Sequence, residues 1–172
     1  MKIEKKNYII REWSLDDSIS LAKYANNIHI WNNVRDYFPH PYTQADGITF
    51  ISKALAKPTP TTDFAIEING EAVGGIGLVL NTDIERIAAE IGYWLGEPFW
   101  NKGIMSQVVQ DVANYTFSNF SISKLYAPVF EYNRASMRVL EKAGFKREAI
   151  LRKAAIKNNK VIDLHYYALF KV

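Results

Sequence analysis

The residues that carry the most chemical information lie between Ala88 and Val109, in the sequence AAEIGYWLGEPFWNKGIMSQVV. An apolar strand that contains Gly92 runs into a short loop, and a helix begins near Gly103. The first N–H groups of a helix have no partner within the helix, and its dipole favours negative charge there. A glycine lets the backbone approach phosphate oxygens closely. This stretch predicts a site for a phosphate-bearing ligand, with an ordinary helix N-terminus as the alternative.

Two further residues indicate a break in the sheet beside this stretch. Gly92 removes a packing side chain from a strand of Ile, Tyr, Trp and Leu residues, which is typical of a bulge or of a close backbone approach. Pro128 interrupts a later strand with a residue that has no N–H to donate. If the two strands pair at their start and separate near these positions, unpaired amide groups face a wedge. We expect such a wedge to accept a ligand.

The hydrophobic pattern predicts the elements that position these residues. Strands are expected at about Tyr8–Trp13, Phe64–Ile68, Glu71–Leu80, Ile87–Leu95, Lys124–Phe130, Phe145–Lys157 and Val161–Phe170. Helices are expected at about 14–26, 43–56, 103–119 and, after an Asn133 cap, up to the stop at Gly144. The turn pairs are Asn69-Gly70 and Asn158-Asn159, and residues 27–42 form an aromatic connector with little regular structure. This order predicts an α/β domain with a mixed sheet.

Composition limits the class of protein. With 172 residues, 48% of them hydrophobic, the chain fits a single domain over residues 1–172. The 21 basic and 18 acidic residues are interspersed, without the basic arm or stripe of a nucleic-acid-binding protein. A chain without cysteine has no disulfide, thiolate metal site or cysteine nucleophile. No signal-like or membrane-spanning apolar run is present, so we expect a cytoplasmic protein with no nucleic-acid or membrane partner.

Three segments together resemble the GNAT N-acetyltransferases, and within them the branch of the RimJ and RimL type N-terminal acetyltransferases. They are AEIGYWLGEPFWNKGIMSQ, then NRASMRVLEKAGF from Asn133 to Phe145, then Asp163 with Tyr166-Tyr167-Ala168. The resemblance implies a mixed, mostly antiparallel sheet of six to seven strands flanked by about four helices. The fourth and fifth expected strands, Ile87–Leu95 and Lys124–Phe130, would be splayed.

The same resemblance implies acetyl-CoA as co-substrate, without a metal. The pantetheine arm would pair with the backbone of Tyr93, Trp94 and Leu95. The pyrophosphate would lie on the loop and helix start, and Asn133 would contact CoA. The cofactor-binding residues of the loop and helix start are Asn101, Lys102, Gly103, Ile104, Met105 and Ser106. Trp100 and Met105 depart from the family pattern, which has a polar residue and a small residue at these places.

The resemblance also implies two catalytic residues. Glu90 corresponds to a carboxylate that acts as general base in some relatives; a solvated or salt-bridged strand carboxylate is the alternative. Many relatives protonate the leaving thiolate with a tyrosine, but that position is Leu140 here. Ser136 is the expected substitute, with an ordinary first-turn serine as the alternative. The three histidines are dispersed and are expected to be structural.

The acceptor region is less well defined by the sequence. Trp31, Tyr37 and Phe38 are expected to line the substrate mouth, with a packed aromatic loop as the alternative. We expect acetyl transfer to a primary amine, foremost a protein N-terminal α-amine. Two alternatives are a small amine such as a polyamine, amino acid or antibiotic, and a CoA-binding sensor without turnover. The protein is expected to be a monomer or homodimer.

Overall fold

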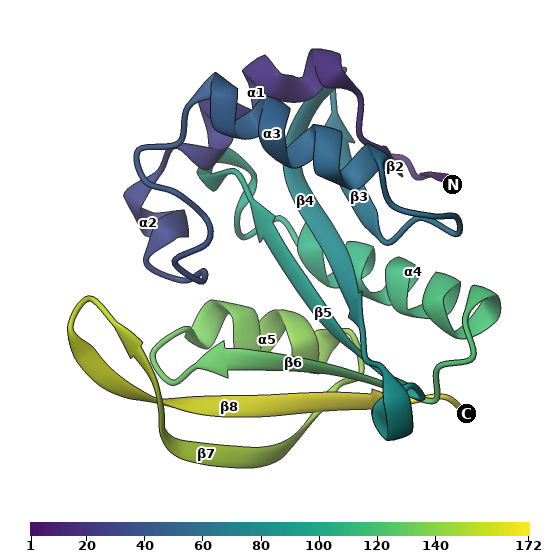
Figure 1. The fold of residues 1–172 in the computed structure, drawn as a ribbon, viewed down its shortest axis with the longest axis vertical. Helices are drawn as coiled ribbons and strands as arrows, with labels where there is room; N and C mark the ends of the chain where they lie inside the picture. Colours follow the sequence, from purple (N-terminus) through teal and green to yellow (C-terminus); the bar gives the residue numbers. More distant parts are fainter. The chain divides into compact units, whose positions relative to one another are not determined.

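A computed structural model describes all residues from Met1 to Val172. Figure 1 shows its strands and helices. The strands are β1 (Lys2–Glu4), β2 (Ile9–Glu12), β3 (Asp63–Ile68), β4 (Glu71–Leu80), β5 (Ala88–Leu95), β6 (Lys124–Phe130), β7 (Lys146–Lys157) and β8 (Lys160–Phe170). The helices are α1 (Ser18–Ala25), α2 (Ile28–Trp31), α3 (Gln44–Leu55), α4 (Ile104–Asn119) and α5 (Arg134–Lys142).

The chain forms two compact units. Unit 1 consists of Met1–Gly77 and Tyr93–Ile104, and unit 2 consists of Leu78–Gly92 and Met105–Val172. β4 and β5 contribute to both units, and the strands are hydrogen-bonded in the order β1-β2-β3-β4-β5-β6-β8-β7. β5 and β6 are parallel, whereas β1–β2, β2–β3, β3–β4, β6–β8 and β8–β7 are antiparallel. The fold is therefore the mixed, mostly antiparallel α/β fold that the sequence predicts.

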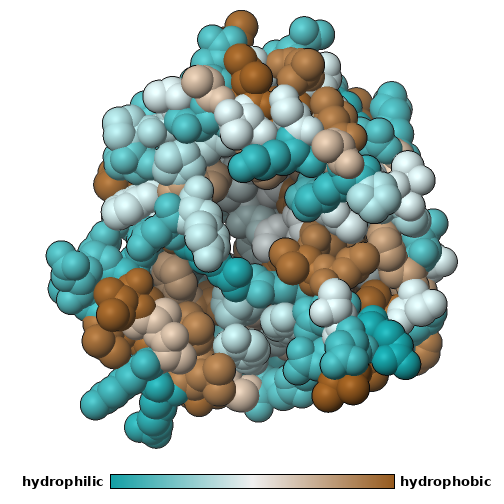
Figure 2. All heavy atoms as spheres, viewed as in Figure 1, coloured by the Kyte–Doolittle hydropathy of each residue, from teal (hydrophilic) through white to brown (hydrophobic).

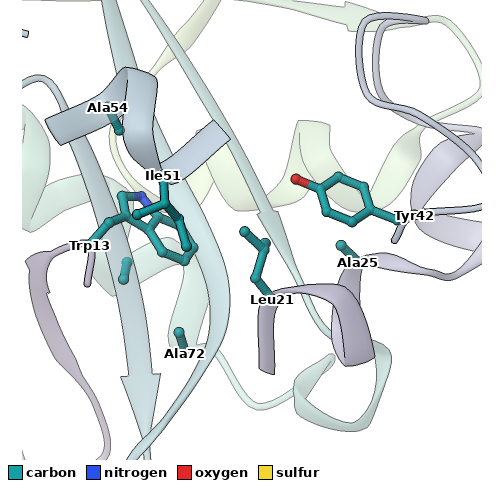
Figure 3. Close-up of a cluster of buried hydrophobic side chains, with 8 residues drawn as sticks. Trp13, Leu21, Ala25, Tyr42, Ile51, Ala54 and Ala72 are labelled. Carbon is teal, nitrogen blue, oxygen red and sulfur yellow. The ribbon is translucent and has the colours of Figure 1, made fainter. Parts of the chain in front are cut away.

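Unit 1 has its own hydrophobic core, between the sheet and the pair of helices α1 and α3. On the face drawn in Figure 2, hydrophobic side chains occur in small groups among hydrophilic ones. Figure 3 shows the buried cluster, in which Trp13 lies beside Ile51 and the Tyr42 ring points toward Leu21. Phe38 and Trp94 pack against this cluster. The cluster thus ties the end of β5, which carries Trp94, to the helices of unit 1.

Local capping signals explain where α1 and α3 begin. Ser14 and Asp17 form a capping box around a 3-10 turn that leads into α1. Thr43 and Asp46 form a second capping box at the start of α3. Asp17 also accepts two hydrogen bonds from Arg11 of β2, at 2.7 and 2.8 Å, so the first cap is anchored to the sheet.

Unit 2 is built on the series β6-β8-β7, with α5 between β6 and β7 in the chain. Asn133 caps α5 by accepting the backbone N–H of Ser136 at 3.0 Å, and Gly144 ends the helix at a φ of 92°. Asn158 and Asn159, both at positive φ, make the tight turn between β7 and β8. These elements agree with the sequence-based prediction.

The predicted element count needs correction. The sheet has eight strands instead of six to seven, because Lys2–Glu4 forms the short edge strand β1 against β2. There are five helices instead of four, because the aromatic connector contains the single helical turn α2, capped by Asn27. Both elements have four residues or fewer, too short for hydrophobic periodicity to indicate them. The prediction of one domain stays a prediction.

The buried Tyr42 makes unit 1 sensitive to alkaline pH. Burial and the negative charge of Asp46 raise the pKa of Tyr42 from 10.0 to about 12. Above pH 10 the unfolded chain loses this proton before the folded chain does, so the free energy of unfolding falls between pH 10 and pH 12. Between about pH 9 and about pH 11, the free energy of unfolding should therefore fall by about 1.4 kcal/mol less for Tyr42→Phe than for the unmodified protein. Urea unfolding at the two pH values measures this difference. Tyr37→Phe, at a side chain that is 93% exposed, is the matched control and should show no such difference.

Candidate functional site

The ladder between β5 and β6 is short. Its three Cα pairs join Ala88 to Lys124, Ala89 to Leu125 and Glu90 to Tyr126. β5 continues to Leu95 and β6 continues to Phe130, but they form no further ladder with each other. Pro128, which has no N–H, lies beyond the last pair. The break therefore falls near Gly92 and Pro128, as the sequence predicts.

In unit 1, the end of β5 is held by contacts of its tryptophan. Trp94 lies over β4, where a Cβ on Gly75 would come within 2.9 Å of the indole Nε1. The edge of the same ring faces Phe38 at 5.8 Å between centroids. The Leu95 carbonyl accepts a 2.6 Å hydrogen bond from Trp100 Nε1. This hydrogen bond fixes the end of β5 and the loop that follows it to each other.

This hydrogen bond explains one departure from the expected glycine-loop pattern. Trp100 stands where the family has a polar residue, and its indole N–H ties the loop back to β5. The residue is therefore structural in this chain. The second departure, Met105, is only 7% exposed, and so is Ile104. Both side chains belong to the core, so the only groups that they could offer to a ligand are main-chain groups.

The loop itself has an unusual backbone. Asn101 and Gly103 both have positive φ, at 60° and 74°. A Cβ added to Gly103 would meet nothing within 4 Å, and the same holds for Gly92 in unit 2. The side chains of Asn101 and Lys102 are exposed, and Ser106 is half-buried in the first turn of α4. The open space over Gly103, directly before the start of α4, fits a phosphate-bearing ligand.

Unit 2 holds Asn133 and Ser136 at the start of α5. Because the Asn133 Oδ1 already accepts the N–H of Ser136, only its amide NH₂ is left to donate to a ligand. Ser136 is half-buried. Leu140 is completely buried, so this position belongs to the core and offers no acidic group. Ser136 is therefore the residue of α5 that provides a side-chain hydroxyl group.

Glu90 lies among aromatic and polar side chains that the sequence reasoning missed. It is half-buried and paired in register with Tyr126. Tyr126 stacks on Tyr166 with 6.0 Å between centroids and 9° between planes, and its hydroxyl donates to Asn81 Oδ1 at 3.1 Å. The available signal was the position of Tyr126 two residues before Pro128, which puts both on one side of β6.

The three predicted acceptor residues do not form one cluster. Phe38 packs against Tyr42 at 4.9 Å and belongs to the edge of the core. Trp31 lies against His40 at 5.8 Å, and Tyr37 is 93% exposed. Their joint role in acceptor binding therefore stays a prediction.

Nothing in the structure points to a metal centre or a membrane span. No group of three or more His, Cys, Asp or Glu side chains is arranged to hold a metal ion. None of the helices is both long and apolar enough to traverse a bilayer.

A mixed sheet with an interrupted parallel ladder, followed by a glycine loop at a helix start, defines a class of α/β proteins that bind phosphate-bearing ligands. Residues 7–146 match the acetyltransferase (GNAT) domain. The chain belongs to this family.

Individual relatives agree with this assignment. The chain is 37% identical over 101 residues to the uncharacterized N-acetyltransferase YoaA of Bacillus subtilis, covering 59% of this chain and 56% of YoaA. It is 32% identical over 103 residues to the putative ribosomal N-acetyltransferase YdaF of the same organism, covering 60% and 56%. The chain thus matches just over half the length of each. A structure of RimL, the ribosomal L7/L12 α-N-protein acetyltransferase, in complex with coenzyme A has a TM-score of 0.87 at 20% identity, covering 99% and 98%.

The open space over Gly103 leads to a first prediction for the site. Gly103→Ala would put a methyl group where a phosphate is expected and should weaken acetyl-CoA binding by about tenfold or more, measured by calorimetry. Gly70→Ala is the matched control, because Gly70 also has a positive φ of 81° and open space, but lies in the turn between β3 and β4. Both variants carry the same backbone strain. Equal affinities in the two variants would contradict the assignment of the loop.

Proposed function

We propose that this protein is an acetyl-CoA-dependent N-acetyltransferase that transfers the acetyl group directly to a primary amine, most suitably a protein N-terminal α-amine. The observation that carries the proposal is the end of the β5–β6 ladder at Glu90, while β5 continues to Leu95. A ligand with amide groups can hydrogen-bond to a strand at such a break. The pantetheine arm of CoA has these groups.

Different residues bind different parts of the co-substrate. The backbone of Tyr93–Leu95 pairs with the pantetheine amides. The loop from Asn101 to Gly103 and the first N–H groups of α4, through Ser106, hold the pyrophosphate, and Lys102 adds a positive charge. The amide of Asn133 contributes a donor. When bound, acetyl-CoA supplies an acetyl group already activated as a thioester.

Glu90 and Ser136 are assigned the catalytic roles. Glu90 accepts the proton of the attacking amine, directly or through water, and its position at the end of the ladder supports this role. The Ser136 hydroxyl donates a hydrogen bond to the departing thiolate, and the proton that Glu90 took from the amine then passes to the thiolate or to solvent. The backbone N–H groups near Trp94 polarise the thioester carbonyl. Tyr126, which is in register with Glu90 and stacks on Tyr166, orients the acceptor amine.

Proton energetics favour an α-amine as the acceptor. An α-amine with a pKa of ~8 costs ~1.4 kcal/mol to deprotonate at neutral pH, whereas a lysine with a pKa of ~10.4 costs ~4.6 kcal/mol. A single half-buried carboxylate, that of Glu90, is better matched to the smaller of these two costs, the deprotonation of an α-amine. The names of YdaF and RimL, which refer to ribosomal proteins, support the same choice.

One observation favours a second function, a CoA-binding sensor without turnover. Leu140 is completely buried at the place where many family members have a tyrosine acid. A chain without an acid for the thiolate could retain acetyl-CoA and transfer nothing.

Release of CoA in the presence of different acceptors distinguishes these functions. We expect turnover with short peptides that have a free N-terminus and none with the same peptides after N-terminal blocking, even when they contain lysine. Intact-mass measurement of the product locates the acetyl group. Faster turnover with a polyamine or an amino acid would favour the small-amine alternative. Tight acetyl-CoA binding with no transfer to any acceptor would favour the sensor.

The role of Glu90 has its own test. Glu90→Gln should lower kcat by about 100-fold near neutral pH while the affinity for acetyl-CoA, measured by calorimetry, stays unchanged. Glu85→Gln makes the same chemical change at an exposed position before β5 and should leave both quantities unaltered. The rate of the Glu90 variant should also rise more steeply with pH, because solvent must then remove the proton. A kcat equal to that of the control variant would refute the assignment.

A further inference from the structure

Unit 2 carries a strongly basic surface, so the expectation of interspersed charges is wrong for this part of the chain. The segment from Arg134 to Lys160 has nine basic and two acidic residues, a net charge of +7, although the whole chain has only +3. The remaining residues therefore carry −4. The segment covers α5, β7 and the turn to β8.

The positive charges of this segment are exposed and largely uncompensated. Lys157 is buried, and the other eight basic residues are exposed. The side chains of those eight make no ion pair and no hydrogen bond, and one carboxylate of β8 lies beside them, because the backbone N–H of Lys153 donates to Asp163 Oδ1 at 2.8 Å. Both acidic residues are already occupied: Glu148 pairs with Lys124 at 2.6 Å, and Glu141 accepts the Tyr167 hydroxyl at 3.0 Å. We call the eight residues the basic surface: Arg134, Arg138, Lys142, Lys146, Arg147, Arg152, Lys153 and Lys160.

The basic residues of α5 and β7 are close in space. Arg134, Arg138 and Lys142 are spaced by four residues, so they share one side of α5. Burial and the hydrogen bond from Tyr167 to Glu141 raise the pKa of Tyr167, and the charges of Arg147 and Arg134 act in the opposite direction. Arg147 is also in register with Tyr167, whose hydroxyl bonds Glu141 of α5, so the start of β7 lies close to α5 and their positive charges contribute to one field.

Exposed aliphatic side chains accompany these charges on the hairpin of β7 and β8. Ile150, Leu151, Ile156 and Val161 are between 43% and 67% exposed. Figure 2 shows hydrophobic and hydrophilic side chains next to one another over this hairpin. The hairpin has a single exposed aromatic side chain, Phe170 at the end of β8. Proteins that bind single-stranded nucleic acid stack bases on aromatic side chains, so this composition favours a polypeptide partner.

We propose that the basic surface is a docking site for an acidic polypeptide segment that carries apolar side chains among its carboxylates. Charge complementarity selects the partner, and the aliphatic side chains of the hairpin pack against its apolar residues. A second copy of this chain is disfavoured, because two surfaces of the same sign would repel each other. The proposal does not depend on acetyl transfer.

Binding of two labelled peptides tests the proposal, measured by fluorescence anisotropy in the presence of saturating CoA. One peptide alternates Glu with Leu, and the other alternates Glu with Ser at the same charge. We expect both to bind, the Glu-Leu peptide more tightly, with an affinity that falls as salt is added. The variant Arg152→Gln/Lys153→Gln/Lys160→Gln should weaken binding by about tenfold. The control Lys2→Gln/Lys6→Gln/Lys53→Gln removes the same charge from exposed positions of unit 1 and should leave the affinity unchanged.

Several results would overturn the proposal. They are no binding of the Glu-Leu peptide, equal losses in the two triple variants, or displacement of the peptide by CoA. Tighter binding of polyuridylate would assign the surface to nucleic acid, and tighter binding of anionic phosphatidylserine vesicles would assign it to a membrane. Self-association that the hairpin variant abolishes would assign it to a second copy. The hairpin variant is Arg152→Gln/Lys153→Gln/Lys160→Gln. Its affinity for acetyl-CoA and its turnover of a neutral acceptor peptide should be unchanged, so this test is separate from that of the proposed activity.

Discussion

The end of the β5–β6 ladder at Glu90 and Tyr126 is the constraint on which the site depends. Two parallel strands would normally pair along their full length, because each unpaired backbone group in a sheet forfeits a hydrogen bond. Here Gly92 and Pro128 remove a side chain and a donor close to the point where pairing stops. In the proposed function, an amide-containing ligand pairs with the part of β5 that lies beyond the ladder, and the last paired residue is the carboxylate proposed as the base.

A site made from main-chain groups tolerates changes in its side chains. Trp100 departs from the family pattern, but its indole N–H fixes the loop to the Leu95 carbonyl. Met105 also departs from it, and its side chain is buried. In both cases the side chain stabilises the local structure, and the backbone N–H groups proposed to bind the pyrophosphate are the same whatever the side chain. Two residues of the loop are constrained by residue type: Gly103, whose φ is 74° and whose Cβ position is open, and Asn101, whose φ is 60°.

Features that depend on neighbours within four positions could be predicted from the sequence. The capping box of the 3-10 turn before α1, the capping box of α3, the turn at Asn158-Asn159 and the cap at Asn133 are of this kind. The sequence could not indicate β1, because a three-residue strand exists only through its pairing with β2. The contact between Tyr126 and Tyr166 depends on the register of two strands forty residues apart, which no local pattern encodes. The glycine loop was predictable because its chemistry is local, and the surroundings of Glu90 were not, because they are long-range.

The basic surface also protects the exposed edge strand β7 from pairing with further strands. β7 is the edge strand of the sheet and is twelve residues long, and long exposed edges tend to recruit further strands. Register shifts after Arg147 and Leu151 interrupt its ladder with β8, and Lys153 adopts a positive φ within the second shift. Irregularity and like charge both oppose pairing between two copies of this strand. The same charges that prevent this association attract a partner of opposite sign, so one set of residues can protect the edge and select what docks beside it.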